Sequence, residues 1–237
     1  MKKSLYILTL LIASSSVYSC FGQSGKYYTI RDFESWSSIN LDYKASKKLS
    51  FGLGEQIRLK DNSSTVNQFF TNASAEYKLT KAFRLGTEFR YIRLNDTEGN
   101  VQGYETHFRS AFYTKFQHKI KRFEMKYRLQ FQSRKEWGLA QGVNSEPTNK
   151  LRLKVGGSYN IKKWKLDPVL STEIFRTIGT NGDFSKIRGT LGTSFDSKKA
   201  GNFGLFYRLE KDLDELYPQT THILGLKYTY SLKRKKK

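Results

Sequence analysis

The sequence predicts an all-β fold: a closed antiparallel up-and-down transmembrane β-barrel of about 10–12 strands. Three observations indicate this class. Apolar and polar residues alternate along most of the chain, the alternating runs are unusually long, and the connections between them alternate in character. No run has the period of an amphipathic helix. We therefore expect strands to make up nearly all of the chain after its N-terminal segment.

The N-terminal segment has the parts of a secretory signal peptide. Lys2 and Lys3 supply positive charge, the stretch from Leu5 to Ala13 is apolar, and small and polar residues follow. This apolar stretch is shorter than the about 20 residues that a membrane-spanning helix needs. We expect export with removal of residues 1–22, and a lead segment or first strand at residues 23–34.

Cys20 is the only cysteine of the chain. It is either a lipoprotein acylation site or part of the discarded signal peptide, and the bulky Tyr18 nearby favours the second interpretation. A mature chain without a thiol can form neither disulfides nor a thiolate nucleophile.

The alternating runs define the expected strands. In the run that begins at Leu49, one face is apolar except for Glu55, while the other carries Gln56 and Arg58. The clear runs are residues 49–60, 83–91, 104–116, 123–132, 151–161, 187–195, 203–209 and 222–232. The weaker runs are residues 36–44, 69–79 and 164–176.

These runs are longer than a soluble protein needs. Strands in globular proteins average about five or six residues, whereas a tilted strand crosses a bilayer with about 9–11. Long strands in an open sheet would also leave exposed edges, which closure into a barrel removes. The mean hydropathy of −0.62 does not argue against a membrane, because half of each strand in such a barrel faces a polar lumen.

The number of runs raises a question about closure. Eleven runs conflict with the even strand number of single-chain bacterial barrels. Either Gly25–Phe33 forms a twelfth strand, or it threads the lumen, or one weak run is not a strand. We expect the barrel at residues 35–232, followed by a basic tail at residues 233–237.

Connections of two kinds alternate along the chain. One kind is short and basic, as at residues 47–48 and 80–81, and the other is longer and polar, as at residues 95–103 and 134–149. Outer-membrane barrels have short periplasmic turns and longer extracellular loops. We therefore assign the basic turns to the periplasm.

Charged side chains on the polar face of the runs are candidates for the lumen. They support either a cationic lining that selects anions or a network of Arg–Glu pairs that fills a narrow barrel. The network is favoured because small barrels fill their interiors with side chains. The candidates are Arg58, Arg84, Glu88, Arg90, Glu105, His107, Arg109, Glu124, Arg128, Arg152, Glu173, Arg188, Arg208 and Glu210.

Aromatic residues make up 15% of the chain, and many lie near the ends of the expected strands. We expect them to form girdles at the membrane interfaces instead of stacking platforms for nucleic-acid bases. The candidates are Trp36, Tyr43, Tyr77, Tyr91, Tyr104, Trp137, Tyr159, Trp164 and Tyr228.

The net charge of +21 comes from 42 Lys and Arg against 21 Asp and Glu, spread along the chain. Outside the C-terminal tail no segment carries the concentrated basic patch that nucleic-acid binding favours. We therefore expect no nucleic-acid partner.

The sequence contains no constellation that predicts catalysis. His107 lies near Glu105 and Ser110, but alternation places Ser110 on the face opposite the other two. His118 falls in an expected turn, and His222 falls on the apolar face of the last run. We expect no enzyme activity, no catalytic residue, no cofactor and no metal site.

Several fragments, in their order along the chain, resemble an outer-membrane β-barrel family of Gram-negative bacteria known as domain of unknown function 2490. The resemblance covers about residues 33–232 and implies a barrel in the outer membrane. No activity is established for that family, so the resemblance implies no catalytic residue. The fragments are Phe33-Glu34-Ser35-Trp36, Gln56-Ile57-Arg58-Leu59, Glu88-Phe89-Arg90-Tyr91, Leu166-Asp167-Pro168, Ser171-Thr172-Glu173-Ile174-Phe175, Phe206-Tyr207-Arg208 and His222-Ile223-Leu224-Gly225-Leu226.

The leading hypothesis is a monomeric outer-membrane barrel that is structural or forms a narrow pore. Its expected partners are outer-membrane lipid and the barrel-assembly machinery, because Gly225 followed by Tyr228 and Tyr230 resembles the C-terminal strand that this machinery recognises. Two alternatives remain open: an exported soluble β-barrel that binds an anionic or lipidic ligand, and a barrel enzyme that acts on lipid.

Overall fold

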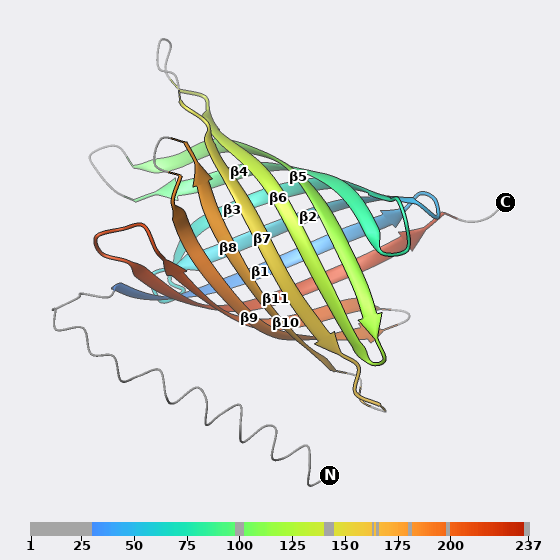
Figure 1. Ribbon diagram of the computed structural model, residues 1–237. Helices are drawn as coiled ribbons and strands as arrows, with labels where there is room; N and C mark the ends of the chain where they lie inside the picture. The colour runs from blue at the N-terminus through green and yellow to red at the C-terminus, as the bar shows by residue number, and fades with distance from the viewer. Residues whose placement is uncertain are drawn as a thin grey trace, which may run out of the picture.

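Eleven strands close into a barrel in the computed structural model (Figure 1). It describes residues 30–97, 102–139, 145–162, 164, 166–179, 182–197 and 200–234. The predicted signal peptide, Cys20 and residues 25–29 lie outside this description, as do residues 235–237 of the tail. Over the described ranges, no helix is long and apolar enough to cross a membrane.

The strands follow one another around the wall in chain order. They are β1 (Ile30–Lys44), β2 (Leu49–Lys60), β3 (Thr65–Lys78), β4 (Phe83–Asp96), β5 (Gly103–Ile120), β6 (Phe123–Trp137), β7 (Thr148–Tyr159), β8 (Asp167–Ile178), β9 (Phe184–Ser197), β10 (Gly201–Asp212) and β11 (Gln219–Lys233). Every alternating run in the sequence is therefore a strand, including the three weaker ones. The closed fold and the expected range of 10–12 strands are confirmed.

Most strands extend beyond the expected runs at one or both ends, and two of the differences bear on the wall. β1 begins at Ile30, so the described part of Gly25–Phe33 extends the first strand and adds no twelfth strand to the described wall. β8 begins only at Asp167. The Asp167 carboxylate accepts hydrogen bonds from the side chain of Asn160 (2.9 Å) and the backbone N–H of Ile161 (3.1 Å), which fixes the end of β7 beside the start of β8.

The expectation of a wholly antiparallel wall is wrong at one seam. β1 and β11 pair in parallel, in an unbroken register from Ile30 opposite Gln219 to Lys44 opposite Lys233. An odd number of up-and-down strands makes the first and last run in the same direction, so closure requires one parallel pair. Figure 1 shows both strands running towards the end of the barrel where the C-terminus lies. The seam pairs both edges that would otherwise stay open.

The two ends of the barrel carry different sets of connections. Residues 45–48, 79–82, 121–122, 160–166 and 198–200 connect strands at the end that bears the C-terminus, and we call this the turn end. Residues 61–64, 97–102, 138–147, 179–183 and 213–218 connect strands at the opposite end, which we call the loop end. The alternation of ends is as expected, although the turn at 61–64 is as short as that at 45–48.

The turn at residues 61–64 is short because its backbone is unusual. Asp61, Asn62 and Ser63 have positive φ angles of 56°, 56° and 64°. In this left-handed conformation the N–H groups of Asp61 and Asn62 point at the carboxylate of Asp32, which accepts both hydrogen bonds at 3.1 and 2.9 Å. The first strand therefore holds the connection between the next two strands.

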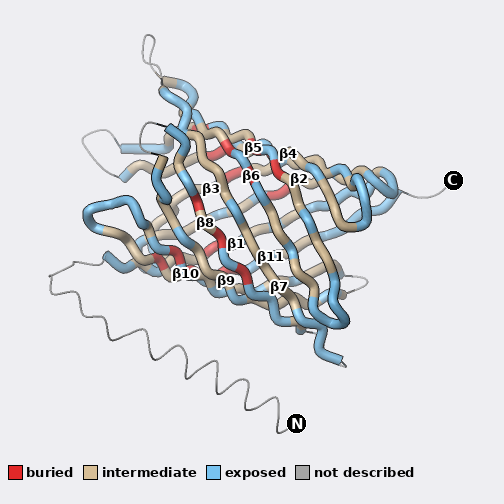
Figure 2. The backbone as a smooth tube through the Cα atoms, in the orientation of Figure 1, coloured by how far each residue is buried: buried red, intermediate tan, exposed pale blue. Residues whose placement is uncertain are grey.

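The alternation places apolar side chains outside the barrel. Phe112, Leu170 and Leu191 are 61%, 64% and 57% exposed on the outer wall. Buried positions form short stretches around the wall, with no gathered apolar core (Figure 2). Seven hydrophobic side chains are buried among the described residues: Trp36, Phe70, Ile92, Ala111, Tyr113, Phe175 and Ile223. Most of the apolar surface of this protein therefore faces outward.

The parallel seam predicts a specific cross-link. Ser37 and Leu226 are register partners, so Ser37→Cys with Leu226→Cys in a Cys20→Ser background should form a disulfide on oxidation. A twelfth strand between β1 and β11 would separate the two residues by about 10 Å, beyond the about 7 Å between Cα atoms that a disulfide tolerates. The measurement is mobility on a non-reducing gel.

The control pair is Ser37→Cys with Leu191→Cys, because β9 is not a neighbour of β1. A folded barrel in which the Ser37 and Leu226 positions fail to cross-link, or cross-link no better than the control pair, would contradict the seam.

Candidate functional site

The charged interior of the barrel is the candidate site. The fourteen candidate lumen residues of the sequence analysis lie at alternate positions of their strands, on the face opposite the exposed apolar side chains. The structure brings eight of them into two ion-pair clusters: Glu88, Arg90, Arg109, Arg128, Arg152, Glu173, Arg188 and Glu210.

Glu88 of β4 is the centre of the first cluster. Its carboxylate accepts hydrogen bonds from Arg90 (2.7 Å), Arg109 (3.2 Å) and Arg128 (2.9 Å), which come from β4, β5 and β6. Its side chain is 11% exposed. Three guanidinium groups around one carboxylate leave the cluster positively charged.

Glu173 of β8 is the centre of the second cluster. Arg152 of β7 donates to one carboxylate oxygen at 2.7 and 3.0 Å, and Arg188 of β9 donates to the other at 3.1 Å. Arg188 also pairs with Glu210 of β10. Arg152 further donates to Gln132 of β6 at 2.9 Å, which joins the cluster to the neighbouring strand.

Four more of the candidates form pairs nearer the rims of the barrel: Arg84, Glu105, His107 and Glu124. Arg84 and Lys115 donate to Glu76 at 3.0 and 2.6 Å towards the turn end. Glu124 pairs with Lys126 at 2.8 Å, also near that rim.

His107 and Glu105 face each other at 2.9 Å towards the loop end. The register partner of His107 on β6 is Glu136, next to the end of that strand, while Ser110 points to the outer wall. The histidine and carboxylate thus meet without a nearby serine.

Trp36 is not part of an aromatic girdle. It points inward from β1, is 3% exposed, and donates from its indole N–H to Glu34 at 2.6 Å. The guanidinium carbon of Arg58 lies 3.5 Å from the centre of its ring, and that of Arg208 lies 4.8 Å away. Trp36 was expected in a girdle because the weak run begins at residue 36, whereas β1 begins at Ile30 and places Trp36 well inside the strand.

Three hollows lie in series along the lumen. The central one, about 300 Å³, is lined by both clusters and by Arg58 and Arg208. It shares Gln132, Phe175 and Arg188 with a hollow of about 470 Å³ towards the loop end. It shares Arg128 and Lys154 with one of about 380 Å³ towards the turn end. The three hollows, which we call chambers, are therefore adjacent along the lumen, with charged and aromatic side chains between them.

Cations dominate the central chamber. Its wall includes three carboxylate residues, Glu55, Glu88 and Glu173, and Glu210 pairs with Arg188 beside it. The cations in its wall number nine: Arg58, Arg90, Arg109, Arg128, Arg152, Lys154, Arg188, Arg208 and Lys227.

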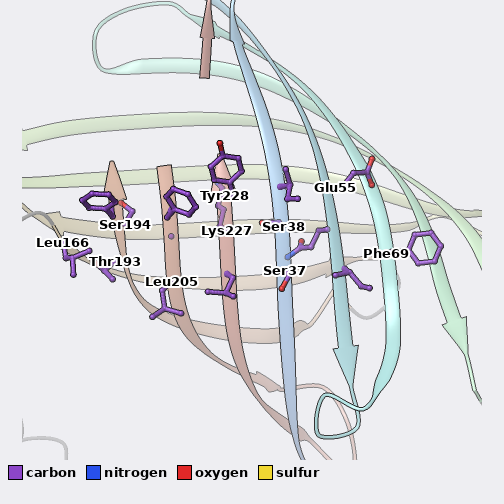
Figure 3. Close-up of a pocket in the computed structure, with 17 residues that line it drawn as sticks. Ser37, Ser38, Glu55, Phe69, Leu166, Thr193, Ser194, Leu205, Lys227 and Tyr228 are labelled. Carbon is purple, nitrogen blue, oxygen red and sulfur yellow. The ribbon is translucent and has the colours of Figure 1, made fainter. Parts of the chain in front are cut away.

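A further hollow, about 690 Å³, lies on the outer wall across the parallel seam (Figure 3). Apolar side chains such as Ile39, Leu205 and Phe69 line it. Glu55 also lines this hollow and lies near the middle of β2, five residues from the nearer end of the strand. Other outward-facing charged residues, such as Arg93 and Lys135, lie within three residues of a strand end. This groove is shallow and has no charged cluster, so the chemistry of the protein lies inside.

Sequence reasoning missed several interior residues. Glu76 belongs to a weak run, and Lys154 and Lys227 alternate with apolar residues in the same way as the chosen candidates. Phe70, Phe175 and Phe206 also point inward, where Arg90, Arg152 and Arg208 lie over their rings at 3.9, 4.6 and 4.7 Å. Alternation places these three phenylalanines on the inner face, whereas their hydrophobicity alone would place them on the outer wall.

Comparison with known proteins gives one family. A family model described as "Protein of unknown function (DUF2490)" matches residues 33–212. No curated protein matches the chain.

The Glu88 cluster predicts a large loss of stability on neutralisation. Glu88→Gln keeps the volume but leaves three arginines without their carboxylate, which should lower the free energy of unfolding by about 3–5 kcal/mol. The matched control is Glu124→Gln, whose partner Lys126 is 58% exposed, and whose expected loss is under about 1 kcal/mol. Urea unfolding of both variants in detergent micelles measures the difference. Equal losses would contradict a structural role for the Glu88 cluster.

Proposed function

The chain belongs to the family described as protein of unknown function DUF2490, and we propose that it is an integral outer-membrane β-barrel with a narrow, anion-favouring passage. Its charged interior supports the barrel and lines the passage. The observation that carries this proposal is the inverted distribution of side chains, with ion pairs inside and large apolar groups outside.

The outer wall supports a membrane environment. Soluble monomers rarely expose contiguous apolar patches larger than a few hundred Å², yet large apolar side chains are exposed on the outer face of all eleven strands. The strands have 12 to 18 residues, which exceeds the about 9–11 needed to cross a bilayer at a tilt. Hydrocarbon is the solvent that would make such a wall stable.

Aromatic residues on the outer wall support the same environment. Tyr43, Tyr77 and Tyr159 are 39%, 43% and 45% exposed near the turn end of their strands. Tyr104 and Trp137 are 44% and 67% exposed near the loop end. Amphipathic rings at both ends suit the two headgroup layers of a membrane.

The remaining parts of the proposal concern location and assembly. Residues 1–22 would direct export, and the barrel-assembly machinery would read the last strand, with the basic turn end in the periplasm. A wall whose every edge is paired needs no second copy for closure, so we propose a monomer. Outer-membrane lipid is then its main partner, and no enzyme activity is proposed.

A passage is favoured over a solid plug by the hollows in the lumen. The three chambers share lining residues, so small solutes have a path interrupted only by side chains. Nine cations in the central wall against three carboxylates attract anions and repel cations. The side chains between the chambers limit the passage to small solutes.

The passage predicts small, anion-selective conductance steps in planar bilayers under a KCl gradient. Lys154→Gln, at a position shared by the central chamber and the one towards the turn end, should lower the anion preference measured from the reversal potential. Lys135→Gln on the outer wall is the matched control and should leave it unchanged. Steps that prefer cations would contradict the proposed lining, and silence after demonstrated insertion would leave a purely structural barrel.

A further inference from the structure

Four cations of the central chamber have no carboxylate partner. Its five other cations pair with Glu88, Glu173 or Glu210. Within the described residues, no ion pair is formed by the remaining four: Arg58, Lys154, Arg208 and Lys227. Lys227 is exposed, whereas Arg58, Lys154 and Arg208 are only partly exposed. Because enclosed charges are costly without a direct partner, these three groups favour an additional negative charge in the chamber.

Arg58 and Arg208 lie on the same aromatic ring. Their guanidinium carbons are 3.5 and 4.8 Å from the centre of the Trp36 indole. β1 holds this ring between β2, which carries Arg58, and β11, next to β10, which carries Arg208. The seam thus brings two positive groups together from strands that are distant in the sequence.

Both guanidinium groups retain unused donors. Arg58 makes one long hydrogen bond, 3.4 Å to Gln56, and its buried Nε has no partner among the described residues. Arg208 donates its Nε to Thr190 at 3.0 Å, which leaves its two terminal nitrogens. Guanidinium groups with free donors are suited to bidentate contact with phosphate or carboxylate oxygens.

The chamber has room for a ligand and routes to it. Its volume of about 300 Å³ exceeds what a single phosphate group fills, since one water takes about 30 Å³. Anions reach it from either rim through the two flanking chambers. The inference rests on the proposed function in this one respect: at least one rim of the barrel must be in contact with water, so that anions can enter the lumen.

We propose that the central chamber is a binding site for a small phosphate-bearing anion, clamped between Arg58 and Arg208 with Lys154 and Lys227 beside it. Phosphate suits the site better than chloride, because several oxygens at fixed angles use the forked donors of both arginines at once. The Trp36 ring positions both arginines and needs no contact with the ligand.

Pyrophosphate is the probe, and calorimetric titration of the folded, lipid-free barrel in neutral detergent is the measurement. Micelles without lipid exclude headgroups as the source of phosphate. We expect saturable binding of one pyrophosphate per chain, weakened roughly tenfold or more in Arg58→Gln and in Arg208→Gln, the loss expected for a charge-assisted hydrogen bond. Inorganic phosphate should bind more weakly, and chloride at equal ionic strength should not compete.

Lys135→Gln is the control for general charge and should bind as the unmodified barrel does. Each arginine variant removes a cation that has no ion-pair partner, so both variants should still form the barrel. Heat-modifiable gel migration checks that they do. Absent saturable binding, equal weakening by Lys135→Gln, or full competition by chloride would each overturn the site. Binding in detergent does not require conduction. If the barrel binds pyrophosphate but shows no conductance in planar bilayers, that result contradicts the proposed passage and leaves the binding site intact.

Discussion

The structure depends on one constraint: the wall turns its apolar side outward, so the charged side chains have to find their partners inside the lumen. In a soluble domain apolar side chains form the core and charges meet water. Here Glu88, Glu173 and Glu210 are each held by arginines, while leucine and phenylalanine cover the outside. The barrel fold, the interior ion pairs and the proposed membrane location are consequences of this inversion.

Two glycines allow aromatic rings to lie close against the inner wall. Gly225 lies under the ring of Phe206, and Gly86 lies under the ring of Tyr113, where any side chain on the glycine would overlap the aromatic atoms. The rings therefore lie flat against the strands, and arginines stack on their free faces, as Arg208 does on Phe206 and Arg128 on Tyr113. Cation–π contacts of this kind stabilise charges where carboxylates are too few.

The alternation in the sequence predicted the eleven strands and their inward faces because side-chain direction in a strand depends only on position parity. The parallel seam escaped prediction because the count of eleven runs was set against the even strand number of single-chain bacterial barrels, although an odd number of up-and-down strands closes only through a parallel pair. Trp36 was misplaced because the weak run begins at residue 36, whereas β1 begins at Ile30. The partners of Glu88 and the chamber around Arg58 and Arg208 depend on register across several strands, which a single sequence does not specify.

Refolding of the mature chain from urea, with and without lipid vesicles, tests most directly whether hydrocarbon stabilises the outer wall. Circular dichroism and gel migration before and after heating report the closed barrel. The account predicts a heat-modifiable β-barrel with vesicles, and aggregation when urea is diluted into plain buffer. A folded, monodisperse chain in plain buffer without any amphiphile would contradict it.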